Sequence, residues 1–579
     1  MAISIQLLDY AEEKKLYGYS LFSTTLALLF LGLFLLLKKD WSTHSATKLP
    51  IVGIESPGYF GIANARSNFV ANGFHILRNA YQKYPGKNFV VTTYGHDKVV
   101  LTHEQVKELS NAPDDTISSS HAAAETLMGE YTGLDRFVDT KYVEDVVRVK
   151  LTQNLVIGVK INKKNPDPEH TPSPDSKLFH QYSDSELLTK IQSTATLKEA
   201  ILEETRFALN TELPECTTGE WTPVDIFTLI IRMVARMSGR AFVGLPLCRN
   251  EDWLKITIQF TTDVFMTQSK LTSVPKLFRP LYVFMRGSAK DLAGDRKKAE
   301  SLLAPIIRKR LEEERLAEKN GTVIRKHNDM LEWLSDRVHP QDKNLEVLSE
   351  LQLILSLASI HSTSLSFFNA ILDLAEHQEY IQPIREEIEA IISANNGVLD
   401  RAALRKMRKT DSFFKESMRG KIGLSMFLTF REVSFNRKVL KDYTLSDGTY
   451  LPKGTLIAAP TLMFSTDPDF IEDPGVFDGF RWYKKSLETE RGAGRRHYWA
   501  TTASNDLTFG HGKHACPGRF FATEEMKIIL TFILLQYDIK YPEGQSRPAN
   551  INRGEFSTPD ATQKLLLKKL PGPKKFSFL

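Results

Sequence analysis

The chain has 579 residues and carries 75 Lys and Arg against 70 Asp and Glu, a formal net charge of +5. So mild a positive charge does not indicate a nucleic-acid-binding protein. Hydrophobic residues make up 42% of the chain and charged residues 25%, which excludes a disordered, collagen-like or multi-span membrane protein. Beyond a short segment near the N-terminus, no change of composition divides the chain, so we expect one large domain.

An apolar stretch over 21–37, LFSTTLALLFLGLFLLL, is the first expected element, and it follows a polar N-terminal segment over 1–20. It has no charged residue and is long enough to cross a bilayer. A cleavable signal peptide is the alternative, but its apolar part would be shorter and would follow a basic segment, whereas Glu12 and Glu13 precede this one. We therefore predict an uncleaved transmembrane anchor at 21–37, a linker with a Pro-Gly hinge over 38–53, and a domain over 54–579.

Helical patterns dominate the domain. The apolar periodicity predicts helices over 224–242, 291–319, 345–376, 380–392, 411–420 and 519–537. Strands are predicted over 89–93, 99–102, 443–445 and 450–458, the last two joined by a turn at Asp447-Gly448. Two polar stretches, 162–184 and 483–505, are typical of exposed insertions. The predicted fold is mostly α with a minor β-sheet.

The predicted helix over 345–376 is apolar around almost its whole circumference, which is typical of a central or a membrane-spanning helix. Residues 353–372 contain no Lys, Arg, Asp or Glu, so a second membrane span is the alternative. The same stretch carries many polar side chains, among them His361, Ser362 and Thr363. We therefore expect a buried central helix.

The decapeptide FGHGKHACPG, from Phe509 to Gly518, is the most informative motif. It sets Cys516 between glycines, immediately before an amphipathic helix. The start of a helix supplies positive potential and free N–H groups, and glycines let a flat cofactor approach the backbone, so the motif favours a thiolate bound to haem iron. A buried structural cysteine and a zinc site formed by His511, His514 and Cys516 are the alternatives. The other cysteines, Cys216 and Cys248, form no C-x-x-C pair with it, and so few cysteines indicate a reducing compartment.

These residues resemble the signature F-x-x-G-x-R-x-C-x-G of the cytochrome P450 haem-thiolate monooxygenases, matched here by Phe509, Gly512, Cys516 and Gly518. The resemblance implies haem b bound through Cys516. It also implies that His514, which replaces the usual arginine, faces a haem propionate and anchors it more weakly. The likeness extends over roughly residues 48–545.

Two further segments resemble structural motifs of the family. Glu416 and Arg419 match its E-x-x-R helix motif, and Arg481 matches the arginine that joins that pair. By itself a Glu and an Arg three apart are usually a solvated surface pair. Their order and distance ahead of Cys516 instead imply a buried structural cluster, in which losing one member would strand a charge.

In the central helix the family carries A/G-G-x-D/E-T-T/S, whereas this chain has ASIHST over 358–363. His361 stands at the acidic position, and Ser362 and Thr363 retain hydroxyl groups. A histidine can relay protons at neutral pH, so we predict that these three residues organise proton delivery. The alternative is that His361 only satisfies a backbone carbonyl.

Arg148 resembles an arginine of the family's W-x-x-x-R propionate contact, although Glu144 occupies the Trp position. A surface arginine is the alternative, with Lys150 as a neighbouring candidate. The Gly492-Ala493-Gly494 segment lacks the third glycine and the helix of a dinucleotide site, so electrons are expected from a separate NADPH-dependent cytochrome P450 reductase.

Within the family the chain most resembles the fungal branch with ent-kaurene oxidase and the indole-diterpene oxidases, on the runs 355–361 and 509–520. This implies a bulky apolar secondary metabolite, such as a terpenoid, oxidised with O₂ by an enzyme anchored in the endoplasmic reticulum, its domain in the cytosol and in contact with membrane lipid. A haem-binding ligand sensor and a rearranging enzyme of the same fold are the alternative functions.

Overall fold

The structure is a computed structural model. It describes residues 47–572 except 56–58, 94–95, 137, 152–183, 214–215, 217–218, 273, 275, 287, 324–325, 420–429, 432 and 489–496. The predicted anchor at 21–37, the greater part of the polar stretch 162–184 and the Gly492–Gly494 segment lie outside the described residues.

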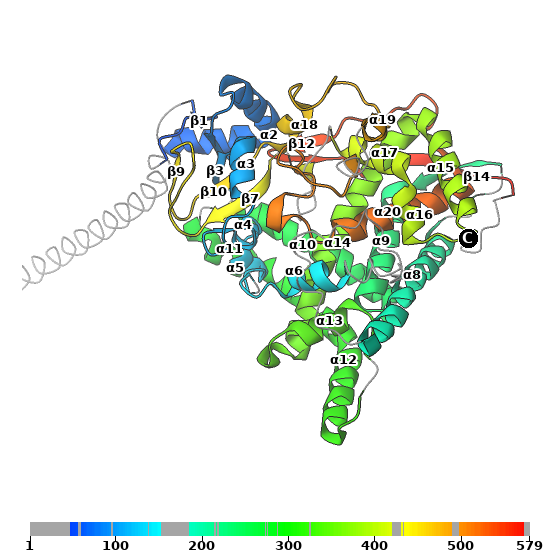
Figure 1. The fold of residues 1–579 in the computed structure, drawn as a ribbon. Coiled ribbons are helices and arrows are strands. Elements are labelled where there is room, and N and C mark those ends of the chain that lie inside the picture. The colour runs from blue at the N-terminus through cyan, green and yellow to red at the C-terminus, as the bar shows by residue number, and fades with distance from the viewer. Residues whose placement is uncertain are drawn as a thin grey trace, which may run out of the picture.

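Helices make up most of the described chain (Figure 1). The longer ones are α2 (Tyr59–Lys83), α8 (Asp184–Glu212), α9 (Ile226–Phe242), α10 (Glu251–Thr272), α12 (Ser288–Asn320), α14 (Leu345–Glu376), α15 (Ile381–Ala394), α17 (Arg408–Arg419) and α20 (Arg519–Gln536). The shorter ones include α3 (His103–Leu109), α4 (Ser119–Thr126), α5 (Gly129–Thr132), α6 (Tyr142–Val146), α11 (Arg279–Arg286), α13 (Met330–Arg337), α16 (Arg401–Lys406), α18 (Thr461–Thr466) and α19 (Arg481–Glu488).

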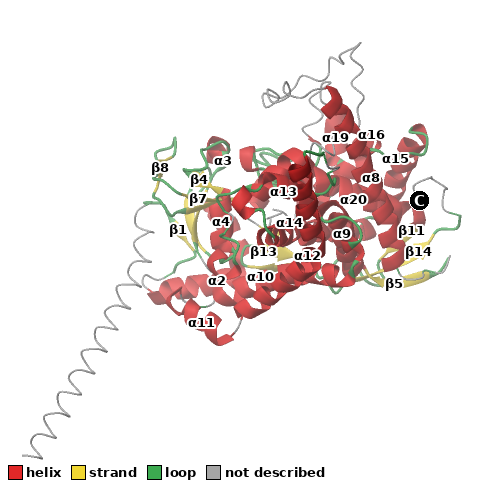
Figure 2. Ribbon diagram, turned by 90° about the horizontal axis from the view of Figure 1, so that it is seen from below, coloured by secondary structure: helices red, strands yellow, loops and turns green. Residues whose placement is uncertain are grey.

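The strands form a minor part of the fold and gather in small sheets at its edges (Figure 2). The largest sheet has the order β1-β2-β3-β10-β7-β4, with β1 (Ile51–Val52), β2 (Phe89–Thr92), β3 (Asp97–Val100), β10 (Leu456–Ala459), β7 (Ser434–Val439) and β4 (Ile117–Ser118). Its pairs are antiparallel except β1 with β2 and β3 with β10. The smaller sheets are β11-β14-β5 (Tyr537–Lys540, Lys564–Lys569, Trp221–Asp225), β12-β13-β6 (Ile551–Arg553, Phe556–Thr558, Phe430–Arg431) and β8-β9 (Tyr443–Thr444, Tyr450–Leu451).

Helix α14 is the central helix that the sequence predicts, with the predicted bounds Leu345–Glu376. Asn344 caps its start by accepting a hydrogen bond from the Val347 N–H at 3.0 Å. Helices α9, α10, α12 and α17 pack around it. Within the described residues it alone is long and apolar enough to cross a membrane, but it is mostly buried inside the protein. The second membrane span is therefore not supported, because this apolar surface is already covered by protein.

Beyond shifts of a few residues at the ends of elements, three predictions differ from the structure. The helix predicted from Val224 begins at Ile226, because Val224 and Asp225 pair with β14 in strand β5 and the Asp225 carboxylate caps the helix from outside. The strand predicted over 450–458 is divided at Pro452, so that β9 forms a hairpin with β8 while β10 joins the largest sheet. Ile51, placed in the linker, pairs with β2.

The polar stretch 483–505 is not wholly an exposed insertion, so this prediction is wrong in part. Its first residues belong to helix α19. Trp499 is only 2% exposed, and its backbone N–H donates to the Asp411 carboxylate at 2.7 Å. The part of this stretch around Trp499 therefore packs against helix α17.

Candidate functional site

The loop 509–518 presents Cys516 immediately before helix α20. The Cys516 N–H donates to the Phe509 carbonyl at 2.7 Å, which closes the loop, and the Phe509 ring is buried against Trp499. A Cβ on Gly512 would lie 2.2 Å from the Ser110 carbonyl oxygen, so only glycine lets the loop approach the end of α3. Gly512 also has a φ of +72°, which glycine adopts without strain.

The Cys516 sulfur faces backbone donors. The N–H groups of Gly518 and Arg519 point at it, and a Cβ on Gly518 would lie 3.9 Å from the sulfur. Burial raises the pKa of the Cys516 thiol, while these two N–H groups and the Arg519 charge lower it. A metal cation bound to the sulfur would lower the thiol pKa further, because a coordinating thiol loses its proton.

His514 takes part in a charged cluster beside the loop. Its Nε2 lies 2.7 Å from an Asp114 carboxylate oxygen and its Nδ1 3.1 Å from the Ser119 hydroxyl. Lys513 and Lys141 also contact Asp114. Burial alone would raise the pKa of Asp114, but the lysine hydrogen bonds and the His514 charge hold it well below its usual range. Both ring nitrogens of His514 therefore contact protein side chains, those of Asp114 and Ser119.

The zinc alternative finds no support in the described part of the chain. His514 is engaged with Asp114, and the His511 Nδ1 lies 3.3 Å from the Thr502 hydroxyl. No group of three side chains suited to a metal ion occurs among the described residues.

Arg148 lies on the outer side of the cysteine loop. It belongs to a π-helical turn, η1 (Val147–Leu151), and its half-exposed guanidinium donates to the Lys513 carbonyl at 2.9 Å and pairs with Glu144. Arg148 therefore joins the turn after α6 to the loop that carries Cys516, whereas Lys150 is exposed.

Arg437 on strand β7 is a candidate that sequence reasoning missed. Its side chain is buried, its Nη1 donates to the Asn436 carbonyl at 2.9 Å, and its Nη2 has no hydrogen-bond partner. Burial lowers its pKa to about 10, against the opposing charges of Glu144 and Asp114. Since a buried unpaired guanidinium is costly, an acidic group suits this place. The sequence signal that could have indicated Arg437 is an arginine at a strand position that faces the inside of the protein.

Three side chains in the middle of α14 are only partly buried. From Val347 to Ala375 every side chain is buried except Ile354, Ala358 and Ser359. The Ser362 hydroxyl donates back to the Ala358 carbonyl at 2.8 Å. A flat cofactor with acidic groups requires a helix surface that is not fully covered, a thiolate and a cationic donor, and Ala358, Cys516 and Arg437 offer these three features.

His361 follows Ala358 by three residues and Ile354 by seven, so it lies on the same side of the helix as these two and about 200° from Ser359 at 100° per residue. Its Nε2 is 3.0 Å from the Ile258 carbonyl of α10, and burial lowers its pKa to about 4, so the imidazole is neutral. This contact is the alternative that the sequence left open.

A buried carboxyl group approaches α14 from α20. The Ser238 hydroxyl on α9 donates to Glu525 at 3.2 Å and lies 3.1 Å from the Ser359 hydroxyl. Burial raises the pKa of Glu525 to about 8, so the carboxyl group holds its proton at neutral pH. Sequence reasoning missed this chain of groups, because its members come from three separate helices.

Glu416, Arg419 and Arg481 form the buried cluster that the motifs predict. The Glu416 side chain is fully buried. Its carboxylate accepts hydrogen bonds from the Arg419 guanidinium at 2.8 and 3.0 Å and from the Arg481 guanidinium at 3.2 Å. Both arginines also donate to the Val476 carbonyl. The cluster therefore fixes the segment before α19 to helix α17.

A long central helix, a glycine-framed cysteine at the start of α20 and a buried Glu-Arg-Arg cluster define the class of a haem-thiolate protein. The family model for cytochrome P450 matches residues 169–567. The chain belongs to the cytochrome P450 family.

Curated relatives agree with this family. A cytochrome P450 monooxygenase of Emericella nidulans, AN1598, is 36% identical over 85% of this chain and 82% of its own length. The ent-kaurene oxidase of Fusarium fujikuroi is 30% identical over 91% of this chain and 89% of its own. Cytochrome P450 monooxygenase 71 of Postia placenta is 33% identical over 96% of this chain and 99% of its own length. The fungal resemblance is thereby confirmed.

Among solved structures, the retinoic-acid-bound cyanobacterial CYP120A1 matches with a TM-score of 0.56 at 17% identity, over 87% of this chain and 96% of that one. At this identity the likeness concerns the fold alone. As a family member the protein is a monooxygenase that uses haem b and electrons from NADPH supplied through a reductase. Its relatives do not favour the sensor or the rearranging enzyme.

Proposed function

We propose that Cys516 is the thiolate ligand of the haem iron in an enzyme that oxidises a bulky, apolar secondary metabolite, such as a terpenoid. The observation that carries this assignment is the pair of N–H groups, from Gly518 and Arg519, aimed at the sulfur. Similarity to ent-kaurene oxidases supports the substrate class.

The residues around the loop would hold the haem by its edge. Arg437 would pair its free Nη2 with a propionate, because that pairing relieves an unpaired buried charge. His514 and Arg148, which bracket the loop through Asp114 and the Lys513 carbonyl, would keep this edge positive. The bound haem supplies oxygen activation with reductase electrons, and the thiolate favours O–O cleavage.

The chain's own contribution on the α14 side is the handling of protons and water. Ser362 offers a hydroxyl beside the partly buried Ala358 of α14, and Thr363 follows it. His361 would take part in proton handling from its position against α10. Its neutral imidazole can hold a proton at one nitrogen only. Glu525 holds a proton two hydrogen bonds from Ser359 and is a second source.

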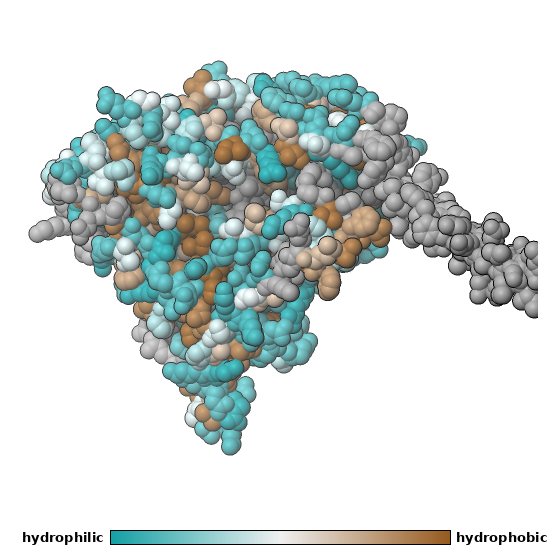
Figure 3. Space-filling view, turned by 180° about the vertical axis from the view of Figure 1, so that it is seen from behind, coloured by the Kyte–Doolittle hydropathy of each residue, from teal (hydrophilic) through white to brown (hydrophobic). Residues whose placement is uncertain are grey.

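A membrane location is part of the proposal, with a single-pass anchor at 21–37, the catalytic domain in the cytosol, and the endoplasmic reticulum as the compartment. Helix α11 and the turn before it support contact with lipid, because they expose five large apolar side chains: Leu277, Phe278, Leu281, Phe284 and Met285. Phe284 is 84% exposed. Figure 3 shows apolar side chains gathered over this part of the surface. Such a patch marks an interaction site. The electron donor would be an NADPH-cytochrome P450 reductase of the same membrane.

The test of the haem assignment is the Cys516→Ser variant, with Cys216→Ser as its control. We expect Cys516→Ser to lose the thiolate-type shifted Soret band of the reduced carbon monoxide complex, whereas Cys216→Ser keeps it. Turnover of apolar terpenoids with reductase and NADPH, aerobic against anaerobic, then tests the reaction. An unchanged spectrum in Cys516→Ser would refute the assignment.

The test of the membrane face uses the protein without residues 1–40. We expect it to retain haem and to leave membranes on alkaline carbonate extraction, but still to bind neutral phospholipid vesicles weakly. Phe284→Ser should reduce this residual binding, whereas Val323→Ser, which alters a fully exposed valine three residues after the end of α12, should not. Equal vesicle binding by both variants would contradict a role for α11.

A further inference from the structure

A cavity of about 250 Å³ lies between α17, α18, the start of α19 and the segment 497–508, which leads into the cysteine loop. Its walls combine hydroxyl groups from α18 and from the segment 497–508 with apolar surface from Phe470, Ile471 and Leu507. At about 30 Å³ for each water, it has room for roughly eight waters or for one small organic molecule. A molecule with both a polar and an apolar part matches such walls.

Lys415 is a cation of this cavity that can bind a further partner. Its side chain is only 9% exposed, and its ammonium lies 2.7 Å from an Asp506 carboxylate oxygen. The same ammonium lies 4.6 Å from the centre of the Trp482 ring. An ammonium has three N–H groups, so the pair with Asp506 leaves it able to bind another acceptor.

Arg419 contributes charge to the cavity but no donor. Its guanidinium has five N–H groups, and the Glu416 carboxylate and three backbone carbonyl oxygens accept hydrogen bonds from all of them. Glu416 is shared with Arg481, so this cluster has two cations against one anion. Since Lys415 and Asp506 balance each other, the charge beside the cavity is positive, and its burial strengthens the attraction for an anion.

Trp482 supplies a donor that lacks a partner. Its indole Nε1 is covered and has no hydrogen-bond partner within the described structure. The ring is held in place by the Lys415 ammonium and by His497, which stacks on it at 6.2 Å between ring centres. An indole N–H can only donate, so it requires an acceptor. The cavity that Trp482 lines is where such an acceptor can be placed.

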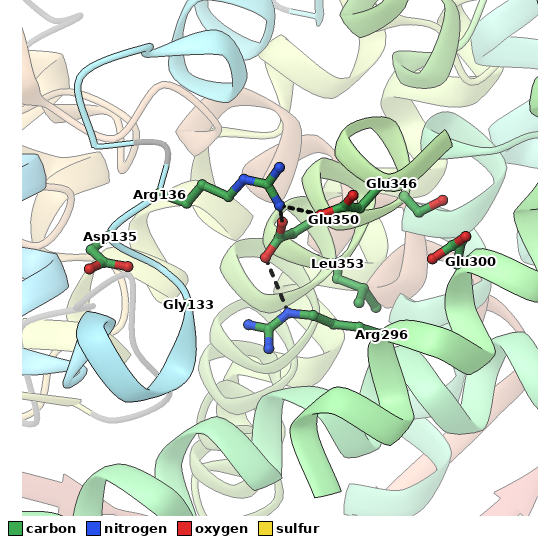
Figure 4. Close-up of a pocket in the computed structure, with 9 residues that line it drawn as sticks. Gly133, Asp135, Arg136, Arg296, Glu300, Glu346, Glu350 and Leu353 are labelled. Atoms are coloured by element: carbon green, nitrogen blue, oxygen red, sulfur yellow. Dashed lines mark hydrogen bonds and ion pairs between the residues drawn. The ribbon is translucent and has the colours of Figure 1, made fainter. Parts of the chain in front are cut away.

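Figure 4 shows a different cavity, between α12, α14 and the loop after α5, whose charge is the opposite. Its lining carries four carboxylates against two guanidinium groups. Arg136 and Arg296 each lie 3.1 Å from an oxygen of Glu350, so both cations already have an acidic partner. An anion is repelled there, which leaves the cavity beside Lys415 as the place suited to one.

We propose that the cavity beside Lys415 binds a small carboxylate with an apolar body, such as benzoate, whose oxygens accept from the Trp482 N–H and the Lys415 ammonium. The apolar body would lie against Phe470 and Leu507. Leu507 stands two residues before Phe509, where the cysteine loop begins, so a bound molecule would stiffen the entry to that loop. The site goes beyond the proposed function and does not depend on the haem assignment.

Equilibrium dialysis of radiolabelled benzoate against the full-length protein tests this site, with 1-phenylimidazole present to fill the haem side. We expect saturable binding of a single benzoate. Trp482→Phe keeps the ring but loses the N–H, so it should weaken binding about tenfold or more, because a hydrogen bond to a charged acceptor is lost. Lys415→Met should also weaken it, and decides if Trp482→Phe does not fold. Trp221→Phe is the control, since Lys540 and Lys568 lie over that ring at 4.5 and 4.8 Å but the ring does not line the cavity.

Benzamide is the matched neutral molecule, and it should bind more weakly than benzoate because it lacks the charge. Benzoate should also slow backbone hydrogen exchange over 500–508 in the unaltered protein but not in Trp482→Phe. No saturable binding, equal benzoate affinities of the unaltered protein and Trp482→Phe, or equal affinities for benzoate and benzamide would overturn the site. Absence of a 1-phenylimidazole spectrum would contradict the haem assignment and leave the benzoate result standing.

Discussion

Replacing Glu416 by alanine tests the buried cluster most directly. The Glu416 carboxylate has no exposed surface and accepts from Arg419, from Arg481 and from the Asp478 N–H at 3.2 Å. Its removal leaves two guanidinium groups, 7% and 8% exposed, without their counter-charge. Losing one partner of such a buried group costs about 3–5 kcal/mol. We therefore expect the free energy of unfolding to fall by about this amount and the segment 465–476 to loosen, because both arginines bind its carbonyl groups.

Urea unfolding followed by the Soret band and by far-UV circular dichroism measures this loss. The control is Glu312→Ala, which breaks a Glu–Arg pair of the same i,i+3 spacing on the surface of α12. Its unfolding should match that of the unaltered protein, because solvated pairs contribute little. Equal unfolding curves for Glu416→Ala and Glu312→Ala would refute the reasoning that burial, rather than pairing itself, makes the cluster important.

Three further predictions concern the haem pocket. Arg437→Leu should release haem about ten- to a hundredfold faster in apomyoglobin capture, because a charged hydrogen bond contributes roughly 1.5–3 kcal/mol, and Arg437→Lys should retain part of the effect. Glu525 has a folded pKa of about 8, above its unfolded value, so its contribution to stability is complete below the unfolded pKa and is lost as pH rises to about 8. The melting temperature of the unaltered protein should therefore fall over this pH range. The melting temperature of Glu525→Gln should not show this fall. Ser362→Ala and Thr363→Ala should lower the ratio of product to NADPH consumed, and His361→Ala should do so more weakly, whereas full coupling in all three would contradict a proton relay.

The sequence determined those features that are written in local patterns. Continuous apolar character predicted the bounds of α14, since such a surface must be buried on all sides. The glycines around Cys516 led us to expect a flat cofactor close to the backbone, whereas at Gly512 the group that approaches closely is the Ser110 backbone. The cluster of Glu416, Arg419 and Arg481 was predicted from the resemblance to the family's motifs and from the order of these residues ahead of Cys516, because spacing alone would indicate a solvated pair.

The tertiary structure decided what depends on residues far apart in the chain. That the His361 imidazole lies against the Ile258 carbonyl of α10 follows from helix packing, which no local pattern contains. Arg437 looks like an ordinary strand residue until burial leaves its Nη2 without a partner. Glu350 pairs with Arg136 and Arg296, which lie more than fifty residues away in the sequence and on other elements. In each case desolvation sets the behaviour of the group, and desolvation is a property of the packed neighbours rather than of the residue itself.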